Sequence, residues 1–142
     1  MIKATGSASA LQLSLDGRPL AVLNHAKLGF SMDGQPYTVR RSGLVGPRYE
    51  LLRDGTMLLS AKQEAFASRY TVNLGDRAWV LKPVEIKTMH FVLFDGVSQV
   101  GEISPAGPTG AIFDITIGLP ELLPLAGQVF VMWLLLWKWG DW

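Results

Sequence analysis

Short apolar or alternating segments follow one another along most of the chain, and Gly, Pro, Asn or Asp residues separate them. This rhythm extends from Ser9 to Gly118 and is typical of antiparallel β-strands joined by tight turns. We predict about eleven strands, at residues 10–15, 20–24, 27–32, 37–41, 49–53, 56–62, 69–74, 78–82, 89–94, 97–103 and 111–117.

Asp-Gly pairs mark several of the turns between these segments. The pair tolerates the positive φ angles of a type I′ hairpin turn, so it is a strong local signal for a hairpin. We predict such turns at Asp16-Gly17, Asp33-Gly34, Asp54-Gly55 and Asp95-Gly96. A further hairpin is expected around Gly75-Asp76. Antiparallel meanders with regularly spaced turns indicate a β-sandwich or a β-barrel.

The C-terminal stretch, residues 119–139, changes to a nearly continuous apolar pattern. Pro120 followed by Glu121 suits a first helical turn, although Pro124 removes a backbone donor and allows the regular helix to start only there. Gln128 is the single polar side chain within residues 125–137, so the helix has no face for solvent. We expect it to bury Leu125, Val129, Phe130, Met132, Trp133, Leu136 and Trp137.

Two environments would cover this helix completely. One is the lumen of a closed barrel, with a wall that includes Leu51, Leu93, Val100 and Ile115. The other is a membrane, in which the terminal tryptophans would form an interfacial belt. A helix over residues 124–139 rises about 24 Å, less than the hydrocarbon core of about 30 Å. We therefore favour the barrel and keep a C-terminal membrane anchor as the alternative.

The expected fold is all-β with one helix, in a single domain over residues 1–142. A closed antiparallel β-barrel of about 11–12 strands, roughly residues 9–118, surrounds a C-terminal hydrophobic helix at residues 119–139. The 142 residues, 49% of them hydrophobic, suffice for one core. Thirteen Lys and Arg balance twelve Asp and Glu without charge runs, which argues against a nucleic-acid partner. Without cysteine or a signal-peptide pattern, we expect a cytoplasmic protein.

Three segments carry a likeness to a known group of proteins: residues 49–61 (YELLRDGTMLLSA), 91–103 (FVLFDGVSQVGEI) and 113–123 (FDITIGLPELL), the last leading into the apolar helix. Their order resembles the tubby C-terminal-like superfamily, which includes LURP-one-related proteins and phospholipid scramblases. The resemblance implies a barrel of about a dozen strands around a central helix. It also implies phosphoinositide binding or lipid translocation, but the scramblases' acidic calcium segment has no counterpart here.

No motif in the chain identifies a reaction. There is no G-x-S-x-G elbow, Walker loop, dinucleotide fingerprint or H-E-x-x-H helix. His25 and His90 have no Cys or acidic pair nearby in the sequence to complete a metal site. We therefore expect neither enzymatic activity nor a cofactor or metal.

Arginines are the best candidates for a binding site, because a guanidinium group binds phosphate oxygens through two hydrogen bonds. The candidates for an anionic head-group site are Arg40, Arg41, Arg48 and Arg69. Adjacent strand residues point to opposite faces, so Arg40 and Arg41 should not converge. The expected function is a non-enzymatic lipid- or partner-binding module, peripheral at anionic membranes. The alternatives are a tail-anchored membrane protein with a cytosolic β domain, or a purely structural or protein-interaction domain.

Overall fold

A computed structural model describes residues 1–64, 68–105 and 113–139 of the chain. Within these residues, twelve strands form one sheet and one helix follows them. The elements are β1 (Ile2–Ser7), β2 (Ala10–Leu15), β3 (Arg18–Leu23), β4 (Gly29–Met32), β5 (Gln35–Ser42), β6 (Arg48–Arg53), β7 (Thr56–Gln63), β8 (Tyr70–Leu74), β9 (Arg77–Glu85), β10 (His90–Asp95), β11 (Ser98–Pro105), β12 (Phe113–Gly118) and α1 (Leu125–Trp139).

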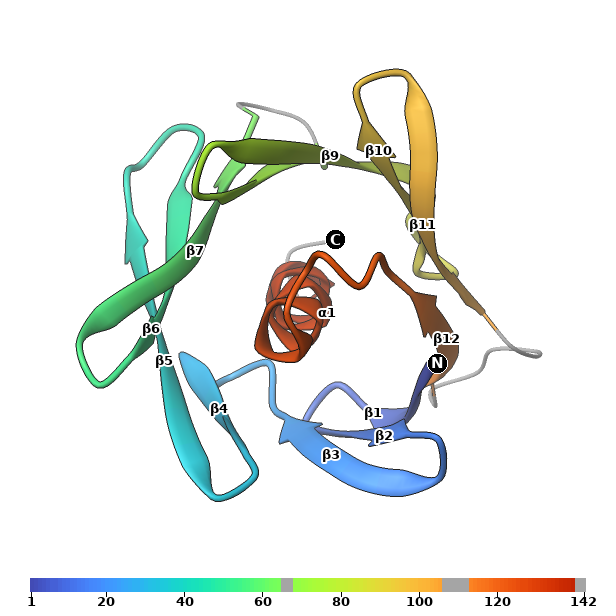
Figure 1. Ribbon diagram of the computed structural model, residues 1–142. Coiled ribbons are helices and arrows are strands. Elements are labelled where there is room, and N and C mark those ends of the chain that lie inside the picture. Colours follow the sequence, from blue (N-terminus) through green and yellow to red (C-terminus); the bar gives the residue numbers. More distant parts are fainter. Residues whose placement is uncertain (65–67, 106–112, 140–142) are drawn as a thin grey trace.

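The sheet curls into a nearly closed barrel around α1 (Figure 1). All neighbouring strands are antiparallel, and their order is β3-β2-β1-β12-β11-β10-β9-β8-β7-β6-β5-β4. The predicted all-β barrel with one C-terminal helix is therefore confirmed. The first and last strands of this order, β3 and β4, are the two edges of the sheet, and they face each other across a seam.

The predicted strand pattern omitted β1, which joins the beginning of the chain to its end. Ile2 pairs with Leu15 of β2 on one side and with Ile117 of β12 on the other. The inward positions of β1 after Ile2 are Ala4 and Gly6, so its apolar pattern is weak. The final predicted strand, residues 111–117, begins at two residues outside the described part of the chain, and the observed β12 starts at Phe113.

Three of the four Asp-Gly pairs form the expected type I′ turns. In each of them both residues have positive φ, with 49°, 53° and 51° for Asp16, Asp33 and Asp54. The fourth pair also marks the predicted hairpin, between β10 and β11, but its turn lies one residue later than predicted. Asp95 ends β10, and the two turn residues are Gly96, with φ of 60°, and Val97.

Gly75-Asp76 connects β8 to β9 as expected, again with Gly at the first turn position and φ of 60°. Glycine at the first central position is the pattern of a type II′ turn, which also matches the twist of a hairpin. Both kinds of turn thus produce the same two-residue connection.

The helix starts later than residue 119. Residues 119–124 form a turn in which the Leu123 amide donates to the Pro120 carbonyl over 3.0 Å. The first helical hydrogen bond runs from the Gln128 amide to the Pro124 carbonyl, over 2.9 Å. Proline lacks the amide hydrogen that would extend the helix backwards. Gln128, the one polar residue within the helix, donates its side-chain amide to the Leu123 carbonyl over 2.9 Å, which ties the connecting turn to α1.

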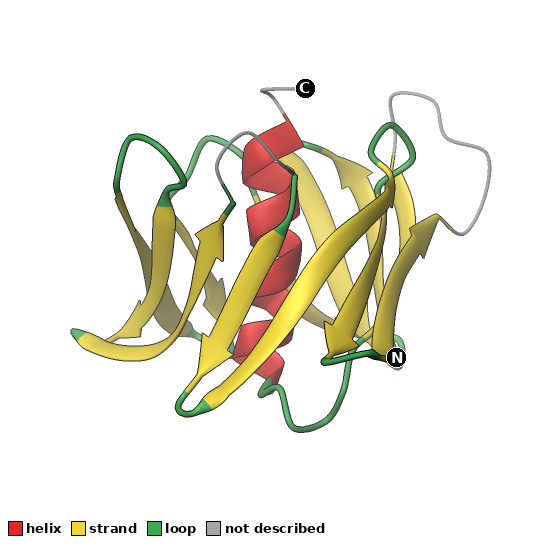
Figure 2. Ribbon diagram, turned by 90° about the horizontal axis from the view of Figure 1, so that it is seen from above, coloured by secondary structure: helices red, strands yellow, loops and turns green. Residues whose placement is uncertain are grey.

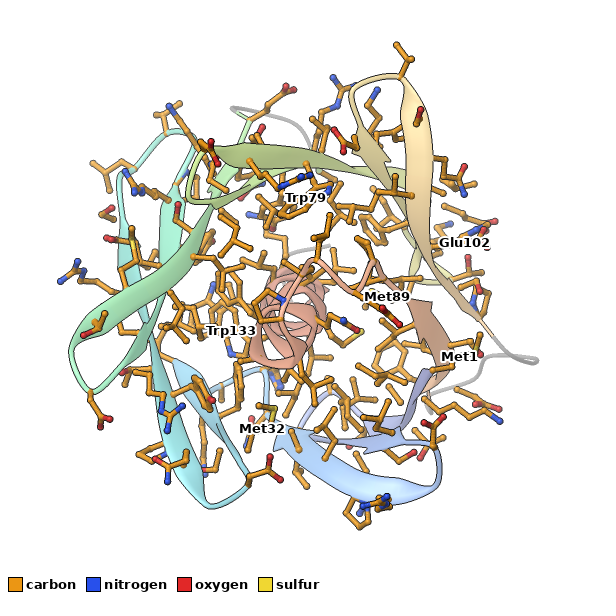
Figure 3. All side chains as sticks on the ribbon, in the orientation of Figure 1. Met1, Met32, Trp79, Met89, Glu102 and Trp133 are labelled. Atoms are coloured by element: carbon orange, nitrogen blue, oxygen red, sulfur yellow. The ribbon has the colours of Figure 1, made fainter. Side chains whose placement is uncertain are left out.

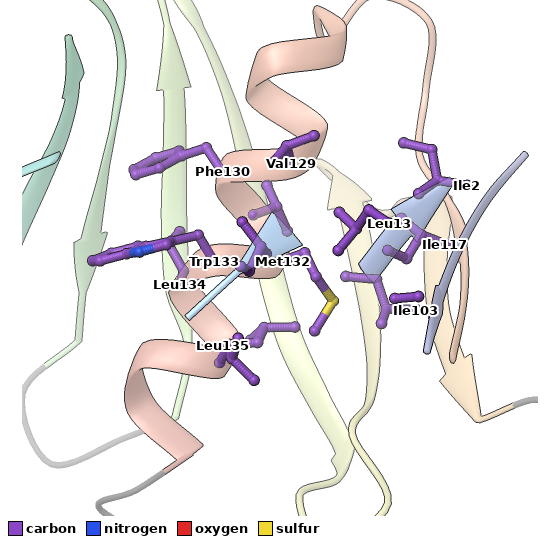
Figure 4. Close-up of a cluster of buried hydrophobic side chains, with 14 of the residues drawn as sticks. Ile2, Leu13, Ile103, Ile117, Val129, Phe130, Met132, Trp133, Leu134 and Leu135 are labelled. Atoms are coloured by element: carbon purple, nitrogen blue, oxygen red, sulfur yellow. The ribbon is translucent and has the colours of Figure 1, made fainter. Parts of the chain in front are cut away.

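Barrel side chains cover α1 on all sides. Every residue from Val129 to Leu136 has an exposed fraction of 0%, while Leu125 and Trp137 are partly buried against the same core (Figure 4). Figure 3 shows Trp133 and Trp79 inside the barrel and Glu102 on its outer face. In the described part of the chain, no helix combines the length and apolarity that a membrane crossing requires.

Three of the four predicted wall residues line the lumen, and one does not. Leu51, Leu93 and Ile115 are fully buried, but Val100 is 37% exposed. The pairing of β10 with β11 shifts after Leu93, which pairs with Gly101, while the next residue pairs with Gln99. Val100 is therefore the extra residue of a β-bulge, and a bulge changes the face to which a side chain points.

The connections alternate between two ends of the barrel because each strand pairs with its neighbour in the chain, except at the seam. The turn end carries five two-residue hairpins, those after β2, β4, β6, β8 and β10, and the start of α1, whereas the two-residue β1–β2 turn lies at the loop end. The loop end carries the longer connections and the last turn of α1, and Figure 2 shows α1 running along the axis between the two ends.

Candidate functional site

An apolar loop projects from the loop end between β5 and β6. It comprises residues 43–47, and its tip is formed by Leu44, 98% exposed, and Val45, 68% exposed. Gly43 and Gly46 on either side have φ of 87° and 63°, a left-handed conformation that favours glycine and turns the tip outward. Two large apolar side chains at such exposure serve no packing role within the chain.

Arginines surround this loop. Arg40 and Arg41 lie near the end of β5, and Arg48 is the first residue of β6. The sequence of this region is R-R-S-G-L-V-G-P-R, so the apolar tip is flanked by positive charge on both strands. The pairing of Ser42 with Arg48 brings the two strand ends together at the base of the loop.

The four predicted arginines have different partners. Arg40 forms an ion pair with Glu50, its cross-strand neighbour, at 3.2 Å, and Arg69 forms one with Glu64 at 3.7 Å. The other two do not form ion pairs with carboxylates in the described structure. Arg41 lies over the Tyr49 ring, 6.0 Å from its centre, and Arg48 contacts the Met57 sulfur at 3.9 Å.

Arg40 and Arg41 do not converge, because the first contacts Glu50 on the outer surface and the second contacts the buried ring of Tyr49 at the barrel rim. Arg41 is thus the predicted residue whose side chain lies at the base of the apolar loop. Arg48 begins β6 beside the loop, but its guanidinium extends along the outer wall to Met57, in the direction of the turn end. Arg69 is paired with Glu64, which lines a small pocket.

That pocket lies at the base of the apolar loop and has a volume of about 340 Å³. Cations contribute to its wall through Arg41 and Lys138, and Glu64 contributes one carboxylate. Lys138 belongs to the last turn of α1, where a positive side chain is favourable beside the free helix carbonyls. The size is at the lower end of the range of about 300–1,000 Å³ for ligand pockets.

Sequence reasoning found Arg41 at this site but missed Leu44, Val45 and Lys138. The first two carried a readable signal, since an apolar pair between two glycines in a predicted loop has no strand or helix to pack it. Lys138 carried none. It reaches the pocket only because α1 threads the barrel and ends beside the β5–β6 connection.

The two histidines hold structural positions. The His25 Nδ1 lies 3.1 Å from the Ala8 carbonyl oxygen, so it links the β3–β4 connection to the β1–β2 turn. The Nε2 of His90 lies 2.7 Å from a carboxylate oxygen of Glu102 on the neighbouring strand. Each contact joins two neighbouring segments of the barrel wall.

Comparison with known proteins gives no match: no family model, no curated protein and no solved structure is similar enough to this chain to be reported. The likeness to the tubby C-terminal-like superfamily therefore stays a prediction from the order of three segments.

Proposed function

We propose that the protein is a non-enzymatic module that binds anionic membrane surfaces peripherally, with its loop end toward the lipid. The main support for this proposal is the apolar tip, Leu44 and Val45, which projects into solvent between arginines in the sequence. An apolar tip flanked by cations suits the boundary between head groups and acyl chains, where it gains apolar contact and electrostatic attraction together.

The magnitudes favour such an interaction. Transfer of a fully exposed leucine side chain from water to an apolar environment contributes about 1.5–3 kcal/mol. A Lys or Arg side chain near an anionic leaflet adds about 1 kcal/mol. Leu44, Val45 and Arg41 together would therefore supply reversible binding and not permanent insertion. The cytoplasmic leaflet carries anionic lipids, in agreement with the cytoplasmic location predicted from the sequence.

The pocket at the base of the loop would receive the phosphate of one lipid head group. Arg41 offers a planar donor pair for phosphate oxygens, and Lys138 adds a second cation from the last turn of α1. The Glu64 carboxylate would accept hydrogen bonds from the hydroxyl or amino groups of a head group. The resemblance to lipid-binding relatives implies the same ligand class.

The test is co-sedimentation of the protein with vesicles of phosphatidylcholine alone or with 30 mole per cent phosphatidylserine, a composition set by the experimenter. We expect association with the anionic vesicles only, and its loss in 1 M salt, where screening confines charge interactions to about 3 Å. Leu44→Ser should weaken binding about tenfold or more, and Arg41→Ala about fivefold.

Matched controls lie at the turn end. Val97 is as exposed as Leu44, at 98%, and Arg77 is an exposed arginine at the start of β9. Val97→Ser and Arg77→Ala should leave vesicle binding unchanged. Equal binding to neutral and anionic vesicles, or equal losses from both ends of the barrel, would contradict the proposal.

A further inference from the structure

The barrel has an open seam between its two edge strands. Among the strands that the structure describes, β3 pairs only with β2, and β4 pairs only with β5. β3 and β4 lie near each other across the seam, but the outer edges of both strands present backbone N–H and C=O groups without a hydrogen-bonded neighbouring strand. Such an edge is a ready template for another extended chain.

The connection between β3 and β4 explains why these edges do not pair. This segment, residues 24–28, bends toward the lumen, where the Trp133 indole nitrogen donates to the Lys27 carbonyl over 2.9 Å. Trp133 is itself held by rings of Phe130, Trp137 and Tyr49, with centre distances of 6.2, 5.2 and 5.9 Å. The helix thus anchors the end of the seam, and β4 is a separate strand of only four residues.

A groove of about 1050 Å³ follows the seam. It extends from Gly17 and Gly34 at the turn end to Asn24 and Lys27 at the loop end, so it accompanies β3 along its whole length. Side chains of Leu20, Phe30 and Tyr37 contribute an apolar floor, in which the rings of Phe30 and Tyr37 are stacked at 5.3 Å.

The two edges are only partly protected against strand addition: β4 is a very short edge strand, and β3 begins with Arg18 and Pro19 and has a bulge opposite Leu13 and Ser14, but the rest of β3 is not blocked. Proteins block exposed edges with lysine, proline or inward-pointing charge. Arg18 and Pro19 protect only the first residues of β3, and the remaining sequence Leu-Ala-Val-Leu has neither charge nor proline. The Gly-Phe-Ser-Met sequence of β4 has none either. Val22, in the middle of the β3 edge, is exposed.

We propose that the seam groove binds an extended polypeptide segment, which adds to the edge of β3 as an antiparallel strand. A polypeptide satisfies the free main-chain groups of the edge, which an acyl chain would leave without partners. Its alternate apolar side chains would contact Leu20, Phe30 and Tyr37. Antiparallel pairing continues the pattern of the whole sheet and is slightly more stable per residue than parallel pairing.

Charge at the two ends of the groove sets the direction of the segment. Lys27 lies at the loop end, where an antiparallel partner of β3 would begin, and Asp33 lies at the turn end, where it would finish. The favoured ligand therefore has an acidic residue at its N-terminal side, alternating apolar residues, and a basic residue at its C-terminal side.

The experiment titrates the full ¹⁵N-labelled chain with the peptide acetyl-Glu-Val-Thr-Val-Thr-Val-Lys-amide and records amide chemical shifts. We expect saturable shifts in residues 20–23 and 29–32. Two analogues are compared with it. One is N-methylated at the Val amides and the other at the Thr amides, so each lacks the hydrogen-bond donors on one edge of the peptide. At least one analogue should bind tenfold more weakly or worse, because a main-chain ladder needs those donors.

Binding of both N-methylated analogues with the parent affinity would overturn the proposal, as would saturable shifts confined to other residues or the absence of saturation. Oleate is titrated in parallel. Groove shifts with oleate and none with the peptide would assign an acyl-chain ligand instead and likewise overturn it.

The direction is tested by charge reversal. Lys27→Glu changes the exposed side chain while the backbone carbonyl that accepts from Trp133 stays in place. It should weaken the binding of the parent peptide about two- to fivefold. It should strengthen, by a similar factor, the binding of a peptide in which the terminal Glu and Lys are exchanged. Lys87→Glu, in the exposed β9–β10 connection, makes the same charge change away from the groove and should alter neither affinity. Equal effects of the two variants, or none from Lys27→Glu, would overturn the proposed orientation.

Discussion

Glycine is required at two kinds of position in this barrel, for different physical reasons. Gly55 follows Asp54 in a type I′ turn with φ of 78°, and a Cβ there would project into open space. Gly29, at the start of β4, has φ of 144°, and a Cβ would fall on the carbonyl oxygen of Tyr37 in β5. The turn therefore needs only the backbone freedom of glycine, whereas the strand also needs the missing side chain.

We predict that Gly29→Ala destabilises the protein more than Gly55→Ala. The turn variant should lower the free energy of unfolding by about 1–2 kcal/mol, which is the cost of the left-handed conformation for an L-residue. The strand variant adds a steric overlap and should cost about 3 kcal/mol or more. Urea denaturation of both variants measures the difference, and equal losses would contradict the close approach of β4 to β5.

At the scale of elements, α1 is the central part of the hydrophobic core. Its residues Val129 to Leu136 are fully buried although they cover all sides of the helix, because the sheet surrounds them. The barrel wall in turn contributes inward side chains such as Leu51, Tyr49 and Phe91, which belong to the same buried cluster as the helix. Sheet and helix therefore stabilise each other, and neither has a separate core.

A chain of residues 1–118, without α1, should not fold cooperatively. Each large buried side chain removed from a core costs about 2–5 kcal/mol, and the whole stability of a domain is about 5–15 kcal/mol. We expect the fragment to be insoluble, or to bind a hydrophobic dye and lose its near-ultraviolet circular dichroism. A sharp, two-state unfolding transition of this fragment would show instead that the barrel has a core of its own.

At the scale of the whole molecule, the two ends of the barrel carry different sets of charged and apolar side chains. The five hairpins of the turn end each contain or adjoin one aspartate: Asp16, Asp33, Asp54, Asp76 and Asp95. The loop end carries cations such as Arg41 and Lys138 around an apolar tip. The turn end also carries Arg18, Arg53 and Arg77, so the orientation depends on the apolar tip: the proposed function predicts a single orientation of the barrel axis, with Leu44 and Val45 toward the lipid.

Single fluorescent labels test that orientation, since the chain contains no native cysteine. Val45→Cys and Val97→Cys place an environment-sensitive label at opposite ends of the barrel, both on exposed valines. On anionic vesicles the label at residue 45 should shift to shorter wavelength and be quenched by spin-labelled lipid. The label at residue 97 should remain as in water, and similar quenching at both sites would contradict a fixed orientation.

Local signals made most of the barrel predictable. Asp-Gly pairs specify hairpin turns within two residues, and alternating segments such as residues 10–15 specify strands. The continuous apolar helix had to be enclosed, which required a barrel or a membrane. These local signals did not predict the outward position of Val100 or the strand β1. A bulge depends on the pairing partner, and β1 is stabilised by β12, which is far away in the sequence.

The amino-acid sequence alone therefore determined most of the strands and turns and the need to enclose residues 125–137, because these follow from periodicity and local backbone preferences. Only the tertiary structure placed Lys138 beside Arg41, separated Arg40 from Arg41 by their partners, and left β3 and β4 as free edges. Those features depend on which distant segments meet when the sheet closes around α1. The same closure, which covers α1 completely, leaves the seam groove and the apolar loop accessible at the surface.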